Sequence, residues 1–539
     1  HMPLINSGGV MQTPWSEGQN VRHLEPLGFI KFDLLGLSTL RMISGAVRHI
    51  LKRHHGIEEP TFAQVREYYN KNLHPDTIDF DNQEVWEEVF HKGKWAGIFQ
   101  MTNGGAQRFC QEAQPTSLLD FAAVTAIFRP GPLSAKAHSL YVANKSNPSQ
   151  VHYEHPIIKE VLGETYGLLV FQEQLAMLAH KLGDNITLDE GNLLRKVLTK
   201  KGTGKDKVKD NLYNKFVKGC NNHGLSEEVA KNLWAKMEFF SGYGFNLSHA
   251  VSYGAVSFQC AWLSYYYPAE WMAAFLDKEP EDRKAQAINT AKSFGFNIVP
   301  PSINKSGRVW EIGDDGKTLI QPLAGIKGLG DSAIDQIIDN RPFESVEDFL
   351  FNENIVYSKL NKKALDVLVR SQSLTELMDE RFTGLRHFWS AVAVDRPRKE
   401  KNLLENIEMY APEGDFSEEE KIEHFASLTG IFPIHEIMPQ EIQDNLMNRG
   451  CPPISEYDPD LQLVWFIPRE VKVKKTKNGK EYWIIHTTDS NAHDARIRCW
   501  GVKENDRISL NKVYIANLEY NDKWGFSTRS IKRSFRRLT

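Results

Sequence analysis

Cysteine is scarce in this sequence, and no two cysteines lie close together. The chain has 539 residues and five cysteines, at positions 110, 220, 260, 451 and 499. Because no C-x-x-C pair occurs, neither a zinc ribbon nor a disulfide framework is indicated. A reducing compartment fits this pattern, and we expect a cytoplasmic protein.

Long apolar runs and a strong charge imbalance are also missing. No segment approaches the roughly 18 consecutive apolar residues of a membrane-spanning helix, and we expect no membrane partner. The first twenty residues are polar and Gly-rich, unlike a signal peptide. The net charge of −4 is unlike that of a histone-like polycation. The content of 41% hydrophobic and 25% charged residues is typical of a globular protein, and the length predicts three or four domains.

The hydrophobic pattern changes along the chain. Residues 29–37 (FIKFDLLGL) alternate and predict a strand, and residues 41–75 predict helix. Residues 80–280 have mostly helical periodicity, interrupted by Gly and Pro. Five segments of period two over residues 461–530 predict a small barrel, of which the OB-fold is the favoured kind. We therefore expect a multidomain, mainly α-helical fold with a C-terminal OB-like β-barrel.

Carboxylates that could hold catalytic metal ions are few. Two-metal phosphoryl transfer needs at least two acidic residues, and Asp33 lies alone in its apolar run. Asp79 and Asp81 form a pair, but Asp81 or Asn82 precedes an amphipathic helix and is favoured as its N-cap. Four further aspartates fall in expected turns: Asp314, Asp315, Asp458 and Asp460. The sequence thus offers no convincing second catalytic carboxylate.

Two segments have the composition of a phosphate-binding surface. Residues 192–210 (NLLRKVLTKKGTGKDKVKD) hold seven Lys and Arg and a Gly-rich break that suits a phosphate backbone. A solvated helix face explains these charges equally well. In residues 241–275, glycines flank Tyr243 before a helix, so that backbone N–H groups and an aromatic face are available to a phosphate. The alternative is an ordinary helix start, capped by Asn246 or Ser248.

The segment GIKGLG, residues 325–330, has the signature of a helix-hairpin-helix turn. Gly328 and Gly330 permit the tight turn, and the next helix would aim its N–H groups at a DNA phosphate without reading bases. Residues 356–374 (VYSKLNKKALDVLVRSQSL) are a candidate degenerate second copy. The sequence therefore predicts a DNA-binding module.

Taken together, these motifs resemble a known family. In chain order they are GGV, KFDLLGLSTL, GIFQM, FRPGPL, TYGLLVFQEQ, NLLRKVLTKKG, SGYGFNLSHAVSYG, YYPAEW, PPSIN, GIKGLG and LTGIFPIHE. The set is similar to the C-terminal portion of the C-family bacterial replicative DNA polymerases, the family of the alpha subunit of DNA polymerase III. A split, phage-encoded version would fit the short, divergent linkers and would place the protein in a bacterial or phage-infected cell.

The resemblance implies a plan of domains. Residues 1–40 look like the C-terminal part of a palm, and residues 41–280 like helical fingers. Residues 281–375 look like a tandem helix-hairpin-helix module that holds duplex DNA. Residues 376–440 are expected to be a charged linker, and residues 441–539 an OB-fold near the single-stranded template.

The resemblance also implies site residues. Asp33 matches the third metal-site aspartate of the family's Lys-Phe-Asp motif, and Lys31 is expected beside a triphosphate or primer phosphate, so both are expected catalytic residues. The residues implied around the incoming nucleotide are Arg129, Arg195, Lys196, Tyr243, Gly244, Phe245, Asn246, Ser248 and His249. Those implied in DNA binding are Lys200, Lys201, Lys205, Gly325, Lys327, Gly328 and Gly330. At residues 196–199, KVLT stands in place of a more arginine-rich family pattern.

Several parts of the family have no counterpart in this sequence. They are the phosphatase-like domain, the thumb, most of the palm with its Gly-Ser and Asp-x-Asp motifs, and the C-terminal domain. We therefore expect the C-terminal piece of a DNA-directed DNA polymerase, inactive alone. It would share two Mg²⁺ ions with an N-terminal fragment that carries Asp-x-Asp, and would extend primer–template DNA with dNTPs. The alternatives are a non-catalytic DNA-binding or clamp-tethering replication protein, and an artificially shortened or split-intein product.

A sliding clamp is a further expected partner. The family's clamp peptide, Gln-x-Asp-Met-Phe, has a counterpart in NIEMY, where Met409 and Tyr410 match the hydrophobic pair. Asn406 and Glu408 stand in place of Gln and Asp. A plain helix end explains these five residues equally well, so both interpretations stay open.

Overall fold

The computed structural model describes most of residues 4–538, in two compact units, His1–Arg41 and Met42–Thr539. The residues outside this description are 1–3, 8, 15–23, 25–26, 31, 33–35, 200–205, 243, 281–282, 411–413, 477, 491–494, 504, 522–524 and 539. Within the described residues, no helix is both long enough and apolar enough to cross a membrane.

The first unit contains one short β-hairpin. Strand β1 (Ile5–Ser7) pairs antiparallel with β2 (Val10–Gln12). The strand expected over residues 29–37 is wrong for its described members, which have no regular structure. Ile30 and Phe32 there are 78% and 81% exposed, so no strand among the described residues covers these two side chains. Lys31 and Asp33 lie outside the described residues.

Residues 42–280 are mainly helical, as expected, and their first part contains a large aromatic core. The helices that form it are α1 (Ser38–His55), α2 (Phe62–Asn72), α3 (Gln83–Val85), the π-helical turn Trp86–His91, α4 (Gly104–Ala113), α5 (Leu118–Ile127), α6 (Pro130–Ser134), α7 (Ala137–Ser146), α13 (Leu247–Tyr266) and α14 (Pro268–Lys278). Helix α5 is apolar on most sides because it packs against α4 and α13. Trp86, Phe121 and Phe258 are fully buried between these helices. Asn82 accepts from Val85 N and caps α3, which confirms the cap interpretation.

A buried ion pair lies at the start of α5. The Asp120 carboxylate accepts hydrogen bonds from Lys145 Nζ at 2.7 Å, Tyr141 Oη at 3.1 Å and Tyr166 Oη at 3.2 Å. Burial alone would raise the pKa of Asp120, but the hydrogen bond and charge of Lys145, with bonds from Thr116 and Tyr141, hold the pKa below its usual range. Asp120 is therefore a structural carboxylate.

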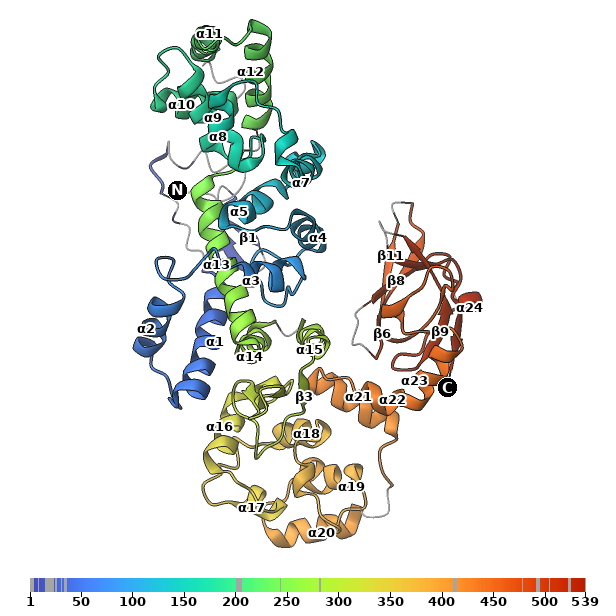
Figure 1. The fold of residues 1–539 in the computed structure, drawn as a ribbon. Coiled ribbons are helices and arrows are strands. Elements are labelled where there is room, and N and C mark those ends of the chain that lie inside the picture. The colour runs from blue at the N-terminus through green and yellow to red at the C-terminus, as the bar shows by residue number, and fades with distance from the viewer. Residues whose placement is uncertain are drawn as a thin grey trace. The chain divides into compact units, whose positions relative to one another are not determined.

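Five further helices enclose a second core (Figure 1). They are α8 (Pro156–Leu162), α9 (Gln172–Leu182), α10 (Leu188–Thr199), α11 (Asp206–Asn222) and α12 (Glu227–Ser241). Glycine permits one close approach between them, because a Cβ on Gly191 would lie 2.6 Å from the carbonyl oxygen of Ala176. This contact packs α10 tightly on α9, which the site described below requires.

The helix-hairpin-helix region is a module with a core of its own. Its helices are α16 (Asp331–Asn340), α17 (Val346–Phe351), α18 (Lys362–Arg370), α19 (Leu385–Trp389), the π-helical turn Ser390–Val394 and α20 (Glu400–Tyr410). The elements that precede it, α15 (Lys284–Ser293), β3 (Asn297–Val299), β4 (Glu311–Ile312) and β5 (Thr318–Ile320), pack instead on the first core, through residues such as Ile288, Ile298 and Leu319. Asp315 accepts from Lys317 N and Thr318 N in the β4–β5 turn, as expected. The linker expected over residues 376–440 is largely folded, because Leu403 and Ile407 of α20 pack in this core. Three more helices follow: α21 (Glu418–Thr429), α22 (Ile434–Ile437) and α23 (Gln440–Asn448).

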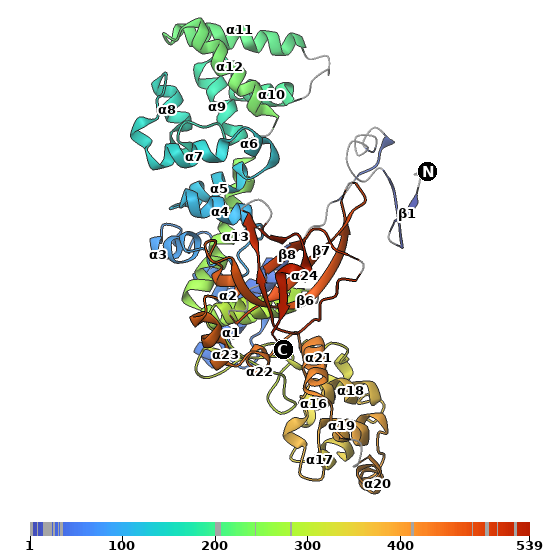
Figure 2. The ribbon, with the colours of Figure 1, turned by 90° about the vertical axis from the view of Figure 1, so that its right-hand side faces the viewer.

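The C-terminal region is a curled sheet with the strand arrangement of an OB-fold. Its strands are β6 (Leu463–Lys475), β7 (Glu481–Thr488), β8 (Ala495–Cys499), β9 (Tyr514–Asn517), β10 (Glu519–Asn521), β11 (Gly525–Thr528) and β12 (Phe535–Arg537), with the short helix α24 (Ile531–Ser534). The order is β10-β11-β8-β7-β6-β9-β12, and β8 and β11 are parallel. Leu518 alone separates β9 from β10, although the strand order places them near opposite edges, so the sheet must curl on itself. Figure 2 shows β6, β7 and β8 side by side in this sheet.

Strand β6 is buried on both faces along its first half. Val464 and Phe466 point into the barrel core, whereas Trp465 and Ile467 pack with residues of α21–α23. In the second half of β6, Arg469 and Val471 are half-buried, whereas Glu470 and residues 472–475 are exposed. This explains why the sequence there changes from the apolar run LVWFI to the alternating REVKVKK.

Candidate functional site

A short backbone bridge joins two segments that are far apart in the sequence. Phe171 and Phe245 form an isolated parallel β-bridge. Gln172 N donates to Phe245 O at 2.8 Å, and Phe245 N donates to Val170 O at 3.3 Å. The residues just before α9 and just before α13 are therefore held side by side.

The side chain of Gln172 extends this bridge to α10. Its Nε2 donates to Gly244 O at 2.7 Å, and its Oε1 accepts from Arg195 Nη1 at 2.5 Å. Only glycine fits at position 244, since a Cβ there would lie 2.7 Å from the Phe240 ring and 3.0 Å from Gln172 Cγ. Gln172 thus fixes a cationic side chain of α10 beside the loop that precedes α13.

Glu173 and Asn246 together satisfy the first turn of α13. Glu173 accepts from Asn246 Nδ2 at 2.6 Å and from Leu247 N at 2.9 Å. Asn246 Oδ1 accepts from His249 N at 2.9 Å, which makes Asn246 the N-cap. Two of the orphan N–H groups of this helix therefore already have acceptors. The expectation that they are free for a phosphate is wrong for these two groups.

Arg129 approaches the same place from the start of α6. Its Nε donates to Ala126 O at 2.9 Å, and its guanidinium carbon lies 4.4 Å from the centroid of the Phe245 ring. Burial lowers the pKa of Arg129, but arginine stays charged at neutral pH. The His249 ring also lies close to Phe245, with the two ring centroids 5.5 Å apart, and its centroid is 4.1 Å from that of Tyr253.

The structure thus brings together most of the described residues that were expected around a nucleotide. We call this group the bridge cluster: Arg129, Gln172, Glu173, Arg195, Gly244, Phe245, Asn246 and His249. Ser248 is exposed in the first turn of α13, where its carbonyl accepts from Ser252. Gln172 and Glu173 were not expected as site residues. The sequence signal that could have identified them is their polar character, because Gln172 and Glu173 directly follow the apolar run LLVF at the start of a helix.

The remaining expected residues of this region are not described. The Lys196 side chain and residues Lys31, Asp33, Lys200, Lys201, Lys205 and Tyr243 lie outside the described part of the chain. Among the residues that are described, no group of three His, Cys, Asp or Glu could hold a metal ion. A metal site at Asp33 stays a prediction.

The GIKGLG hairpin has the geometry that its glycines predict. Gly328 has φ +90°, a conformation that favours glycine, and Gly330 precedes α16 as its N-cap residue. Lys327, Gly328 and Gly330 are exposed. Gly325 is buried against Gln321, so its part is in packing rather than in surface contact.

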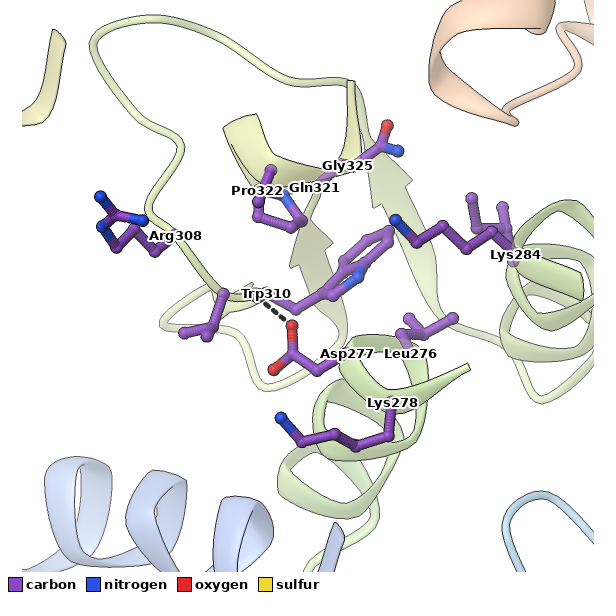
Figure 3. Close-up of a pocket in the computed structure, with 12 residues that line it drawn as sticks. Leu276, Asp277, Lys278, Lys284, Arg308, Trp310, Gln321, Pro322 and Gly325 are labelled. Atoms are coloured by element: carbon purple, nitrogen blue, oxygen red, sulfur yellow. Dashed lines mark hydrogen bonds between the residues drawn. The ribbon is translucent and has the colours of Figure 1, made fainter. Parts of the chain in front are cut away.

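A pocket of about 200 Å³ adjoins the base of this hairpin (Figure 3). Trp310 and Pro322 line it, and Asp277 Oδ1 accepts from Trp310 N at 3.0 Å. Arg308, at the rim, forms ion pairs with Asp331 and Asp335 of α16. These ion pairs neutralise the negative charge of Asp331 and Asp335, which would otherwise repel an anion at the start of α16.

One face of the barrel combines aromatic and basic side chains. The Tyr482 and Trp500 rings stack with their centroids 4.6 Å apart. Register places Lys474 opposite Tyr482, and Lys472 opposite Ile484, which in turn pairs with Arg498. This face was not predicted from the sequence, although alternate residues of EYWIIHTT and ARIRCW form it.

The NIEMY residues lie in the last turns of α20. Asn406 is buried, and its Nδ2 donates to Ala391 O at 2.9 Å and Asp395 O at 2.5 Å. Met409 is 56% exposed, and Tyr410 is half-buried. This geometry favours the helix-end interpretation, because clamp binding through Asn406 would require it to leave both carbonyls.

Comparison with known proteins gives matches along most of the chain. Residues 50–224 match the family described as bacterial DNA polymerase III alpha subunit finger domain, and residues 295–384 match a helix-hairpin-helix motif. The first match contains Arg129, Gln172 and Arg195 of the bridge cluster. The second contains the GIKGLG hairpin.

Three curated relatives are each named DNA polymerase III subunit alpha. The chain is 31% identical over 476 residues to that of Aquifex aeolicus, 33% over 361 residues to that of Campylobacter jejuni and 31% over 387 residues to that of Pseudomonas aeruginosa. These alignments cover 86%, 66% and 69% of this chain, but 38%, 28% and 31% of the relatives. The chain therefore spans less than two fifths of the length of these relatives.

Proposed function

Because this chain belongs to the C family of bacterial replicative DNA polymerases, as a portion of an alpha subunit, we propose that it is the C-terminal piece of a DNA-directed DNA polymerase. The observation that carries the proposal is the bridge cluster. It joins the FRPGPL, FQEQ, NLLRK and GFNLSH segments in one place. A triphosphate is a polyanion, and Arg129 and Arg195 are the described cations that the cluster holds in defined positions.

In this proposal the bridge cluster receives the incoming dNTP. Arg195 and the adjacent Lys196 would contact the phosphates. Phe245 and His249 would offer ring faces to the nucleotide. Gln172 and Glu173 are positioning residues, since they bind Arg195 and Asn246 rather than a ligand.

Nucleotidyl transfer in this family needs two divalent ions, which supply Lewis-acid stabilisation of the reacting oxygens when bound. Of this chain's residues, Asp33 would hold Mg²⁺, and Lys31 would lie near the phosphates. One carboxylate does not hold two ions. We therefore propose that an N-terminal fragment supplies the remaining ligands through its Asp-x-Asp motif.

Two surfaces would hold the DNA. The exposed hairpin residues Lys327, Gly328 and Gly330 suit the phosphate backbone of a duplex, to which helix-hairpin-helix turns bind without reading bases. On the barrel, the stacked pair Tyr482 and Trp500 with its neighbouring lysines suits single-stranded template, whose bases stack on aromatic rings.

Primer extension tests this proposal. The chain alone should not extend a primer, and the chain with an N-terminal alpha-subunit fragment that carries Asp-x-Asp should do so in Mg²⁺. Asp33→Ala should abolish that extension. Asp79→Ala should retain it, because within the described residues Asp79 accepts a hydrogen bond only from Asp81 N, in the turn before α3. Efficient extension by the chain alone would refute the need for a partner.

The second candidate is a non-catalytic DNA-binding or clamp-tethering replication protein. The exposed hairpin favours it, since the whole hairpin and the helix that follows it belong to this chain. The same assay separates the two candidates. Duplex binding by the parent chain, with no extension in the presence of any alpha-subunit fragment, would support this alternative.

A further inference from the structure

The end of helix α21 is bonded to the base of the GIKGLG hairpin. Lys327 N donates to Leu428 O at 2.8 Å, and Gln321 Nε2 donates to Thr429 O at 2.6 Å. The last carbonyl groups of a helix have no partner within the helix, and here donors from the hairpin region satisfy two of them. We call these two hydrogen bonds the α21 latch.

The Gln321 half of the α21 latch is buried. Gln321 and Thr429 are each 1% exposed. Gly430 then ends α21 in the left-handed conformation, with φ +73°. Phe425 and Ile431, which lie before and after these residues in the sequence, both belong to the first core. The end of α21 is therefore fixed against the first core as well as against the hairpin.

The same helix is attached to the barrel. Ala426 of α21 belongs to the apolar cluster that contains Phe432 and Trp465, and Trp465 is a residue of β6. Near the start of α21, Glu419 forms an ion pair with Lys512, two residues before β9. One helix therefore contacts the hairpin through hydrogen bonds and the barrel through apolar packing and an ion pair.

The chain that leaves α21 is also held by the barrel. The guanidinium carbon of Arg469 lies 3.4 Å from the centroid of the Phe432 ring, and its Nη1 donates to Asn511 Oδ1 at 2.5 Å. The register between β6 and β7 shifts at this arginine, between Pro468 and Glu470. A β-bulge of this kind re-aims a side chain. The connection from α21 to the barrel thus has polar as well as apolar contacts.

Gln321 carries an energetic cost that packing alone does not explain. Its Oε1 is buried and has no hydrogen-bond partner among the described residues, and a buried acceptor without a partner is costly. Methionine has a similar shape and would fill the same space without an unpaired acceptor of its own. What the amide adds is a directed hydrogen bond to Thr429 O. Gln321 is therefore a positioning residue for the hairpin.

We propose that the α21 latch holds the hairpin and the barrel at one separation, so that the chain binds preferentially where duplex DNA continues into a single strand. A DNA molecule that reaches both surfaces binds more tightly than one that reaches a single surface, because its second contact is intramolecular. That gain is greatest when the separation of the surfaces matches the span of the DNA. The choice of ligands rests on the proposed function, in which the hairpin receives duplex and the barrel receives single strand.

Anisotropy of three labelled DNAs, measured on the full chain at one salt concentration, tests this inference. The DNAs are a blunt duplex, a single strand, and the same duplex with a single-stranded 5′ extension. The parent chain should bind the extended duplex about tenfold more tightly than the blunt duplex. Gln321→Met should keep the parent affinities for the blunt duplex and the single strand, and should lose about threefold to tenfold in affinity for the extended duplex.

Gln259→Met is the matched control. Gln259 is 2% exposed, donates from Nε2 to Leu73 O at 2.7 Å, and likewise has an Oε1 without a partner among the described residues. Because Gln259 takes no part in the α21 latch, this variant should bind all three DNAs as the parent does. A general loss of a buried glutamine is thereby separated from loss of the latch.

A second variant keeps the test valid if Gln321→Met does not fold. Gln321→Met exchanges one unpaired buried acceptor, Gln321 Oε1, for another, Thr429 O, so we expect it to fold, and circular dichroism checks this. Gly430→Ala strains the end of α21, because φ there is +73°, although its Cβ would meet no atom closer than 3.6 Å. It should show the same selective loss for the extended duplex.

Three results would overturn the inference. The first is an unchanged preference for the extended duplex in the folded latch variants. The second is an equal loss for blunt and extended duplex, since Gln321 would then support the hairpin alone. The third is a parent chain that binds duplex and single strand without preferring the extended duplex, a result that leaves the proposed function intact. A parent chain that binds neither duplex nor single strand would instead refute the proposed function, and the inference with it.

Discussion

Gln172 and Arg195 are joined side chain to side chain, with Oε1 of the amide accepting from Nη1 of the guanidinium at 2.5 Å. The other end of the same amide donates to the carbonyl of Gly244. Gln172, which is neutral, therefore fixes the position of the Arg195 guanidinium of α10 relative to the loop before α13. This relationship makes the bridge cluster a unit rather than a set of separate motifs.

We expect Gln172→Ala to weaken dNTP binding without preventing folding. Loss of a hydrogen bond to a charged group costs about 1.5 kcal/mol, which is roughly a tenfold change in affinity. The KM for dNTP in the reconstituted extension assay measures this. Gln440→Ala, on the exposed start of α23, is the control. An unchanged KM would show that Arg195 does not depend on Gln172 for its function.

Gly244→Ala should destabilise the fold. The added Cβ would lie 2.7 Å from Phe240, whose ring is buried, and overpacking of this kind costs about 1–3 kcal/mol. Urea unfolding monitored by tryptophan fluorescence measures the loss. Gly104→Ala is matched, because nothing lies within 4 Å of its Cβ and its φ is ordinary. Equal stability of the two variants would contradict the packing described for the bridge cluster.

Lys145→Met should leave an uncompensated buried carboxylate at Asp120. The two side chains are 14% and 7% exposed, and breaking such a pair costs about 3–5 kcal/mol. Chemical denaturation at pH 7 gives the change in the free energy of unfolding. Lys231→Met breaks the exposed pair with Glu227 and should have little effect.

The pH dependence of stability should report the same carboxylate. The folded pKa of Asp120 is lowered, so its contribution is present above the unfolded pKa of about 4 and is lost as the pH falls through the folded value. Asp120→Asn should remove that part of the acid dependence. The test is a comparison of unfolding midpoints between pH 5 and pH 2. An identical acid slope in variant and parent would show that Asp120 does not titrate as described.

Asn406→Ala should cost about 1–3 kcal/mol, because two buried carbonyls lose their donor. Asn402→Ala, exposed on the same helix, should cost little. Met409→Ala should leave stability unchanged, which makes it the clean variant for clamp binding. A pull-down with a cognate clamp then decides whether NIEMY is more than a helix end. Equal capture of Met409→Ala and the parent would remove the clamp interpretation.

Local chemistry was predictable from the sequence, and long-range pairing was not. The cap at Asn82 and the turn at Gly328 follow from residue type and immediate neighbours. The hydrogen bond from Gln172 to Gly244 joins residues that are far apart in the sequence, and no hydrophobic periodicity predicts that they are neighbours. The region expected to be a charged linker contains more packed helix than its sequence indicates, because the charges of α20 conceal the i, i+4 apolar pair Leu403 and Ile407. The described residues of 29–37 do not form the expected strand, because alternation leads to a strand only where a partner strand pairs with it, and none does so in the part of the chain that the structure describes.

Strand β6 has a consequence for any attempt to isolate the barrel. Trp465 and Phe466 are adjacent in the sequence but belong to different hydrophobic clusters. The cluster that contains Trp465 also contains Phe432, Ile434 and Met438. A polypeptide that begins at residue 441 would lack Phe432, Ile434 and Met438, and would therefore lose part of the apolar surface on which Trp465 and Ile467 pack. The autonomous folding unit therefore starts upstream, with α21, and the helices that precede the barrel should melt together with it in a single cooperative transition.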